Sequence, residues 1–126
     1  MIRHPGLLLP IITLGITVPG LAQVPTEQEL DEPVERLSCP LPPYPANLRQ
    51  AGIEGSVTLR FIVDSTGRVE QGSVAVVSAT DPGFEAPARE MILNCQFRPG
   101  RVAGEPVRAS LEMLIVFNLA NKEPQR

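Results

Sequence analysis

Aromatic residues and histidine are scarce in this chain of 126 residues. It has no tryptophan, one tyrosine, four phenylalanines and a single histidine, His4. Proteins that bind single-stranded nucleic acid stack the bases on several aromatic side chains, and this chain has too few of them to do so. The near-absence of histidine also removes the most common acid–base catalyst and a common metal ligand.

Concentrated positive charge is missing as well. The chain carries 11 Lys and Arg against 14 Asp and Glu, for a formal net charge of −3, and both signs are scattered along it. Binding to the phosphate backbone needs clustered Lys and Arg side chains. The sequence therefore predicts no nucleic-acid partner.

The chain has no uninterrupted run of about 20 apolar residues, which a membrane-spanning helix needs. Its longest apolar stretch, "LLLPIITLGITV", contains Pro10, follows the basic Arg3 and precedes the small residues Gly20 and Ala22. That order is typical of a secretory signal peptide. We expect residues 1–22 to be a signal peptide cut after Ala22, with the rest exported; the alternative is an uncleaved inner-membrane anchor.

Two cysteines, Cys39 and Cys95, are the only ones in the chain. In an exported protein two cysteines most often form one disulfide. This bond would close a loop of about 57 residues and stabilise the fold by about 4 kcal/mol. The pair has no C-x-x-C spacing and no nearby lysine or histidine to lower a thiol pKa, so we expect a structural bond rather than a redox pair.

The two ends of the exported part are unlike its middle. Residues 23–38 are acidic and interrupted by prolines, which predicts a flexible arm, and residues 120–126 predict a loose tail. The paired carboxylates of the arm are typical of a solvated segment rather than a catalytic site. One folded domain is left, over 39–119, of a size that gains much from a disulfide.

Hydrophobic periodicity predicts five elements in this domain. A short helix over 45–51 is followed by a strand over 55–64, where apolar residues alternate, and by a second strand over 69–79. Residues 81–95 have helical spacing, with Asp81 as its cap, and 107–119 is a long third strand. The order α-β-β-α-β predicts an α+β fold, with a three-stranded antiparallel sheet and two helices on one face.

The inventory of residues does not support an enzyme. If residues 1–22 are removed, no histidine remains, and no serine or threonine lies in a recognisable nucleophile motif. The chain also has no phosphate loop and no calcium-loop spacing. We therefore expect no catalytic residues, no metal and no cofactor, and interpret the chain as a binding module.

Several short motifs, taken in order, resemble one family. They are "YP" before the first helix, "G-x-x-G" entering the first strand, "V-D-x-x-G-R-V" across the turn, and "F-R-P-G" with "G-x-P-V" before the third strand. Each is weak alone, but at these spacings from Pro42 to Leu119 they resemble the C-terminal domain of TonB-type energy transducers. The resemblance implies the TonB/TolA-like fold and a periplasmic location.

The resemblance also implies a partner and a site. Domains of this family pair with a short peptide of outer-membrane transporters, the TonB box, which adds as a strand beside the last strand of the domain. Carried over to this chain, the implied peptide-binding residues are Pro43, Tyr44, Pro45, Val107, Arg108, Ala109, Ser110, Leu111, Glu112, Met113, Leu114, Ile115, Val116 and Phe117.

Two features depart from the full transducers. The N-terminus has the pattern of a cleavable signal, and an arm over 23–38 reaches only about 50 Å when fully extended. Any contact with an inner-membrane motor complex is therefore expected to run through another protein. The alternative function is a structural, TolA-like envelope domain or a self-associating scaffold, in which open sheet edges pair two copies as a homodimer.

The signal-peptide hypothesis makes a direct prediction. We expect the protein purified from the periplasm to begin at Gln23, because Gly20 and Ala22 provide the two small residues of the cleavage site. N-terminal sequencing checks this, and a sequence beginning at Met1 would instead show the uncleaved anchor.

Overall fold

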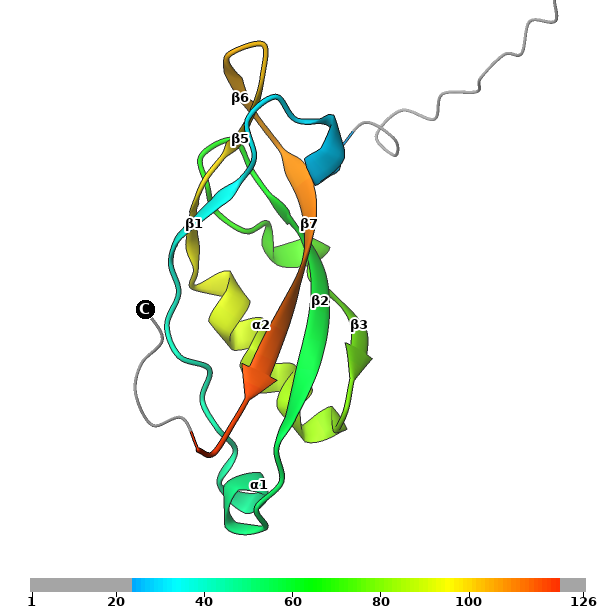
Figure 1. The fold of residues 1–126 in the computed structure, drawn as a ribbon, viewed down its shortest axis with the longest axis vertical. Coiled ribbons are helices and arrows are strands. Elements are labelled where there is room, and N and C mark those ends of the chain that lie inside the picture. Colours follow the sequence, from blue (N-terminus) through cyan, green and yellow to red (C-terminus); the bar gives the residue numbers. More distant parts are fainter. Residues whose placement is uncertain (1–23, 121–126) are drawn as a thin grey trace, which may run out of the picture.

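The computed structural model describes residues 24–120, so the expected signal peptide and most of the expected loose tail lie outside the described part. A three-stranded antiparallel sheet forms its centre (Figure 1). The strand order is β3 (Ala75–Ala79), β2 (Gly55–Val63), β7 (Ala109–Phe117), with β2 in the middle. Together with two helices this confirms the predicted α+β class.

β2 and β7 pair without interruption over nine positions, from Gly55 opposite Phe117 to Val63 opposite Ala109. The predicted alternation is confirmed, since every second side chain of β2 is fully buried and the matching residues of β7 line the same core. The residues between them lie on the other face and are half-buried or exposed. The buried side chains of the two strands are Val57, Leu59, Phe61, Val63, Ala109, Leu111, Ile115 and Phe117.

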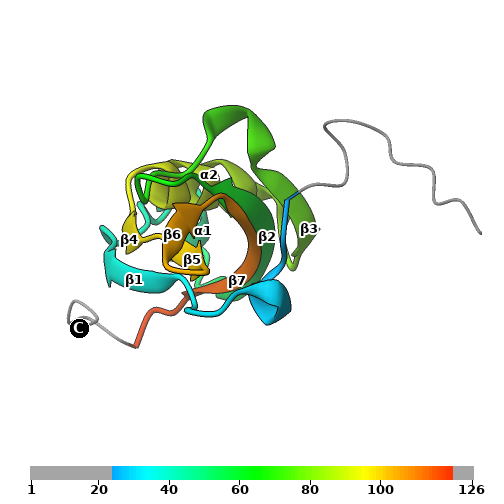
Figure 2. The same ribbon diagram turned by 90° about the horizontal axis from the view of Figure 1, so that it is seen from above.

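One helix covers the core face of the sheet. α2 (Glu85–Leu93) buries Ala88 and Ile92 and follows the 3-10 turn η3 (Pro82–Phe84), whose cap is Asp81 as predicted, accepting from the Gly83 N–H at 2.8 Å. The second helix, α1 (Ala46–Gln50), lies at the end of the sheet and reaches the core through one residue (Figure 1). Seen along the long axis, α2, β2, β7 and β1 surround the core (Figure 2).

An aromatic cluster joins the start of α2 to the end of β7. The rings of Phe84 and Phe117 stack with their centroids 4.3 Å apart, and Tyr44 meets them edge-on at 5.6 and 5.7 Å. Gly55 makes room for this cluster, because a Cβ there would lie 2.9 Å from the Phe84 ring and 2.0 Å from Thr80 Oγ1. Edge-to-face and offset contacts of this kind add to the stabilisation from burial alone.

The second strand is shorter than predicted. Asp64 accepts hydrogen bonds from the N–H groups of Thr66 and Arg68, and Gly67 adopts φ 94°, which forms the expected turn. The chain then enters the 3-10 turn η2 (Gln71–Ser73) instead of continuing as a strand. There the hydroxyl of Ser73 accepts from the N–H of Ile62 at 2.9 Å, in place of the backbone carbonyl that a continuing strand would have offered.

Two short ladders complete the described part. β1 (Glu35–Ser38) pairs antiparallel with β4 (Gln96–Arg98), and β5 (Gly100–Val102) pairs with β6 (Glu105–Val107). The sequence predicts one strand over 107–119, but the structure ends β6 at Val107 and begins β7 at Ala109. The reason is a change of partner, since Val107 lies opposite Gly100 whereas Ala109 lies opposite Val63.

The expectation of a flexible arm over 23–38 needs a correction from residue 24 on. The N–H groups of Asp31 and Glu32 donate to the carbonyl of Arg101 at 2.8 and 3.1 Å, and the Arg101 N–H donates back to Glu32 at 3.0 Å. β1 then continues along β4, with an ion pair between Glu35 and Arg98. Two of the acidic residues that suggested a solvated arm, Glu32 and Glu35, therefore have arginine partners across these ladders.

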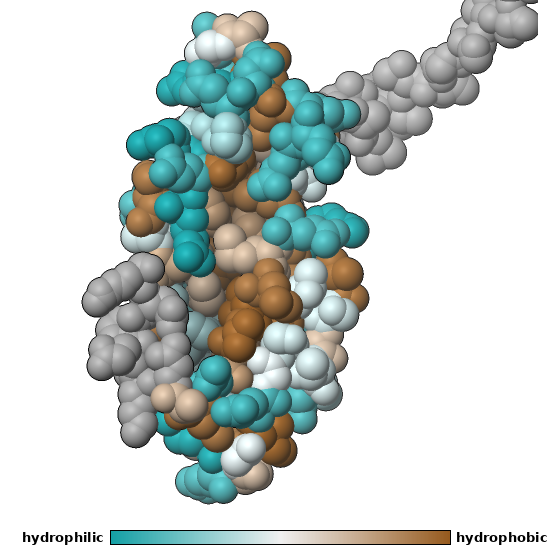
Figure 3. All heavy atoms as spheres, viewed as in Figure 1, coloured by the Kyte–Doolittle hydropathy of each residue, from teal (hydrophilic) through white to brown (hydrophobic). Residues whose placement is uncertain are grey.

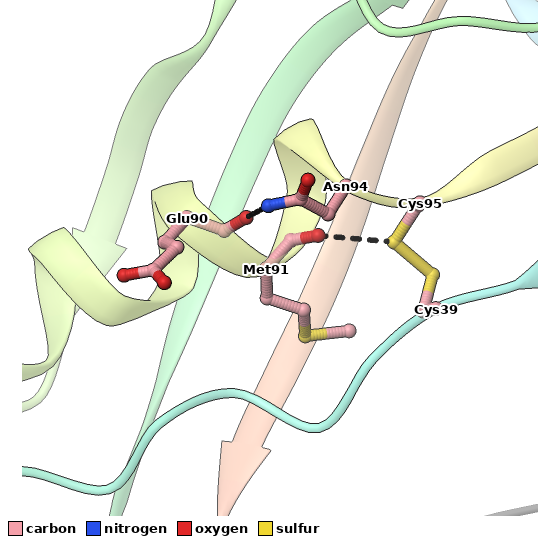
Figure 4. The surroundings of a disulfide bond; sticks show 5 residues. All are labelled: Cys39, Glu90, Met91, Asn94 and Cys95. Atoms are coloured by element: carbon pink, nitrogen blue, oxygen red, sulfur yellow. Dashed lines mark hydrogen bonds between the residues drawn. A yellow bond between two sulfur atoms is a disulfide. The ribbon is translucent and has the colours of Figure 1, made fainter.

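The predicted disulfide between Cys39 and Cys95 is present, with an S–S distance of 2.01 Å. It joins the end of β1 to the residue that follows the C-cap of α2 (Figure 4). The C-cap is Asn94, whose side chain donates to the Glu90 carbonyl at 2.8 Å. Among residues 24–120 no helix is long and apolar enough to cross a membrane.

Removing the disulfide should destabilise the domain by about 4 kcal/mol, because the bond restricts a loop of about 57 residues in the unfolded chain. Chemical denaturation of the double variant Cys39→Ser/Cys95→Ser against the oxidised wild type measures this difference. Hydrogen exchange should show that residues 39–45 loosen before the sheet does. Two free thiols in protein isolated from the periplasm would contradict the structural role of the bond.

Candidate functional site

β7 is an edge strand of the central sheet as far as residues 24–120 are concerned, because β2 pairs with one side of it only. Backbone groups of alternate residues point to opposite edges of a strand. The Ser110 N–H points away from β2, since it donates to the Pro25 carbonyl at 2.9 Å. Glu112, Leu114 and Val116 share this direction. We call their outward N–H and C=O groups the open edge.

The residue opposite Ser110 supports this assignment. Ile62 uses its own N–H and C=O on the other side of β2, bonding Ser73 Oγ and the Glu70 N–H at 2.9 and 2.8 Å. The pair of Ile62 and Ser110 is therefore one of the positions that exchange no hydrogen bonds between the two strands. The same alternation of inward and outward backbone groups then holds along the whole of β7, because its pairing with β2 has no bulge.

The side chains of the open edge are largely apolar. Leu114 and Val116 are 59% and 56% exposed and lie on the sheet face opposite the core. Apolar atoms gather over the middle of β7, with polar residues above and below (Figure 3). An unpaired strand edge with exposed apolar side chains is a surface that a further strand can join.

Charges that could guard this edge have partners elsewhere. Glu112 accepts from Arg60 on β2 at 2.6 Å, and Arg108 bonds both carboxylate oxygens of Glu70, at 2.7 and 2.9 Å. Inward-pointing or free charges are a common defence of an edge strand against pairing. Here both charges are held on the side of β2 and η2, so they leave the backbone of the open edge accessible.

The structure separates the strand residues implied by the resemblance into groups. Val107 lies in β6 and Arg108 in the link to β7, so neither belongs to the open edge. The buried or half-buried residues Ala109, Leu111, Met113, Ile115 and Phe117 face the core. Ser110, Glu112, Leu114 and Val116 remain on the outward side.

The predicted contacts Pro43, Tyr44 and Pro45 lie at the end of β7. Tyr44 donates its hydroxyl hydrogen bond to the Ile53 carbonyl, and the Arg49 guanidinium lies 5.0 Å from the ring centroid. Partial burial, followed by the negative charge of Glu54, raises the pKa of Tyr44. Tyr44 therefore fixes the position of its segment against the aromatic cluster.

Pro43 faces a different feature. It lines an open groove of about 350 Å³ between the proline-rich segment and α2, together with Pro40, Leu41, Glu90, Met91 and Asn94. In Figure 1 this segment runs beside α2, on the side toward which the open edge of β7 points. Within residues 24–120 no group of three or more His, Cys, Asp or Glu could hold a metal ion.

Sequence reasoning missed the contact of Pro25 and Thr26 with β7. Thr26 forms an isolated parallel bridge with Ser110, and the 3-10 turn η1 (Glu27–Glu29) follows it directly. The Glu29 carboxylate accepts from the Thr26 N–H at 3.0 Å, as in a capping box. The spacing T-x-x-E was the one signal that could have indicated an ordered turn here.

Residues 40–119 match the family described as Gram-negative bacterial TonB protein C-terminal. The chain belongs to this family. Among solved structures it is similar to the solution NMR structure of the Pseudomonas aeruginosa TonB C-terminal domain, with a TM-score of 0.58 and 23% identity over 71% of this chain and 90% of that one. No match was found among curated proteins.

Membership of the TonB C-terminal family confirms the resemblance read from the motifs. The family consists of non-catalytic protein-interaction modules that interact with outer-membrane transporters, and it indicates a periplasmic setting. The matched region contains β7 and the "YP" segment but begins after Cys39. Residues 24–39, including the contact with Ser110, therefore lie outside the part that this chain shares with the family.

The ion pair between Arg108 and Glu70 predicts a pH-dependent stability. Hydrogen bonds from Arg108, and then its charge, lower the pKa of Glu70. A carboxyl group with a lowered folded-state pKa stabilises the fold above its unfolded pKa, about 4.3, and this contribution is lost as pH falls through the lower folded value. Thermal unfolding of Arg108→Ala should therefore differ from wild type at pH 7 and converge with it under acid.

Arg36→Ala is the matched control, because it removes an arginine that has no ion-pair partner among the described residues. Its difference from wild type should not change with pH in the same window. A difference for Arg108→Ala that stays constant from pH 7 to pH 2 would contradict the assigned pair.

Proposed function

We propose that this TonB-family domain is a periplasmic binding module that captures an extended peptide segment of an outer-membrane transporter, the TonB box, by strand addition beside β7. The observation that carries the proposal is the open edge, where Glu112, Leu114 and Val116 direct three successive sets of backbone groups outward. Main-chain hydrogen bonds provide affinity in this mode of recognition, and alternate side chains provide specificity.

The chemistry of the surroundings supports an apolar peptide. A strand beside β7 would contact the exposed side chains of Leu114 and Val116 on one face of the sheet. On the other face it would approach the proline-rich segment, which Tyr44 and the disulfide hold in place. A partner strand that meets fixed surfaces loses less binding energy to ordering the protein than one that meets loose loops.

Energy transduction is a separate step from peptide binding, and we propose that it needs a second protein. Residues 25–38 pack on the domain itself and do not extend away from it as a spacer would. We therefore propose that any contact with an inner-membrane motor complex is indirect. The peptide-binding role does not depend on this step.

Peptide titration tests the proposal. The purified oxidised chain is titrated with synthetic TonB-box peptides from outer-membrane transporters of the same genome, and binding is followed by calorimetry and by NMR. We expect saturable binding with slowed amide exchange at Glu112, Leu114 and Val116. Gel filtration accompanies the titration, and a stable dimer whose edge amides do not respond to peptide would favour the self-associating scaffold instead.

A proline variant tests the main-chain mode of binding. Leu114→Pro removes one outward N–H from the open edge but none of the hydrogen bonds to β2, and edge strands tolerate proline at such positions. We expect about a tenfold loss of peptide affinity, as for one lost hydrogen bond near the upper end of its usual range. Unfolding midpoints show whether the variant is folded.

The matched control lies on the opposite edge strand. Val77 is the extra residue of the bulge in β3, since Thr58 pairs with Ser78 and Leu59 with Val76, and it is 46% exposed. Val77→Pro should therefore leave peptide affinity unchanged. Equal losses in Leu114→Pro and Val77→Pro would contradict binding at β7.

A further inference from the structure

We infer that residues 24–32, which we call the strap, block strand pairing at the first outward position of β7. We call this block the stop, and we infer that it sets the register of the strand that binds there. This inference rests on the proposed function. It assigns a specificity-determining role to a segment that lies N-terminal to the family-matched region. The strap would restrict an incoming peptide to the open edge at Glu112, Leu114 and Val116.

The strap occupies the first outward position of β7. The Pro25 carbonyl accepts the Ser110 N–H at 2.9 Å, and Thr26 forms a parallel bridge with the same residue. The chain then turns away from the sheet at η1, so the contact ends there. Since Pro25 has no N–H of its own, it takes the Ser110 donor without offering a donor to extend the ladder.

Two side chains of the strap hold it in place. Leu30 packs on Gly100 so closely that a Cβ at Gly100 would lie 2.6 Å from Leu30 Cδ1 and 3.1 Å from Cδ2. The Asp31 carboxylate accepts the N–H of Ala103, in the turn between β5 and β6. Both anchors lie on the β5–β6 ribbon rather than on β7, so the position of the stop does not depend on the peptide.

The backbone adds a third attachment. The N–H groups of Asp31 and Glu32 donate to the carbonyl of Arg101, and the Arg101 N–H donates back to the carbonyl of Glu32. The strap is thus a third strand-like segment on the ribbon, while its first residues cross to β7. A peptide that added beside Ser110 would have to displace Pro25 and break these contacts in sequence. A peptide that begins at Glu112 would break none of them.

The consequence is a fixed register. A strand edge of uniform backbone accepts a peptide at several registers, and a shift by one residue reverses which side chains face each surface. The strap removes the positions before Glu112 from this choice. A bound peptide would therefore meet Leu114 and Val116 in one alignment.

Amide exchange measured by NMR on the full oxidised chain tests the stop. In the free protein we expect the Ser110 amide to exchange at least tenfold more slowly than the Leu114 amide. A saturating TonB-box peptide should slow Leu114 and Val116 and leave Ser110 unchanged. In the double variant Leu30→Ser/Asp31→Ala, Ser110 should exchange at least tenfold faster without peptide, and the peptide should then slow it too.

Gly100→Ala is a second variant that reaches the same contact from the other side, because its Cβ would displace Leu30. It should reproduce the double variant, which keeps the test valid if one of the two fails to fold. Gly72→Ala is the matched control, since a Cβ at Gly72 meets nothing within 4 Å. Ser110 exchange in Gly72→Ala should equal that of the wild type.

Three results would overturn the inference, and they separate it from the proposed function. If Ser110 exchanges as fast as Leu114 in the free chain, the strap does not occupy the edge. If the peptide slows Ser110 together with Leu114 in the intact chain, peptide binding stands but the strap is no stop. If the peptide slows no amide of β7 in the intact chain or in the released variants, the proposed function itself fails and the stop fails with it.

Discussion

The uninterrupted pairing of β2 with β7 is the constraint on which the rest of the structure depends. Over nine positions it has no bulge, so it fixes which side chains of β7 enter the core and which backbone groups face outward. Both consequences follow from the same alternation, because the directions of the side chains and of the backbone groups both change from one residue of a strand to the next. The same pairing that buries Leu111 and Ile115 therefore exposes the backbone of Leu114.

The proline-rich segment 39–45 lies near the end of this strand and is held in a fixed position. Tyr44 packs against Phe84 and Phe117, and the disulfide holds the beginning of the same proline-rich segment to the end of α2. Prolines add to this rigidity by reducing the conformational freedom that the unfolded chain loses on folding. The segment "CPLPPYP" is thus tied at both ends, although its composition alone is that of a linker.

Much of the central fold could be predicted from the sequence, because it depends on local periodicity. The alternation in β2, the stripe on α2 and the cap at Asp81 are all short-range signals. The family motifs placed the candidate edge on the last strand. Which backbone groups of β7 face outward could not be predicted, since this depends on the register with β2. The ion pairs of Arg60 and Arg108 could not be predicted either, because they join residues 52 and 38 positions apart. The strap was missed because charged, proline-containing segments are usually solvated, and its contacts with Ser110 and with the β5–β6 ribbon join residues far apart in the sequence.

The position of the disulfide also decides how the domain would respond to a mechanical load. A pull on the chain at residue 24 acts first on the hydrogen bonds of the strap and then on the ladder of β1 with β4, which can open one pair at a time. At Cys39 this peeling stops, because the covalent bond transfers the load to Cys95 beside the core. Tension from the N-terminal side would therefore unfasten the strap while the sheet and its aromatic cluster remained folded.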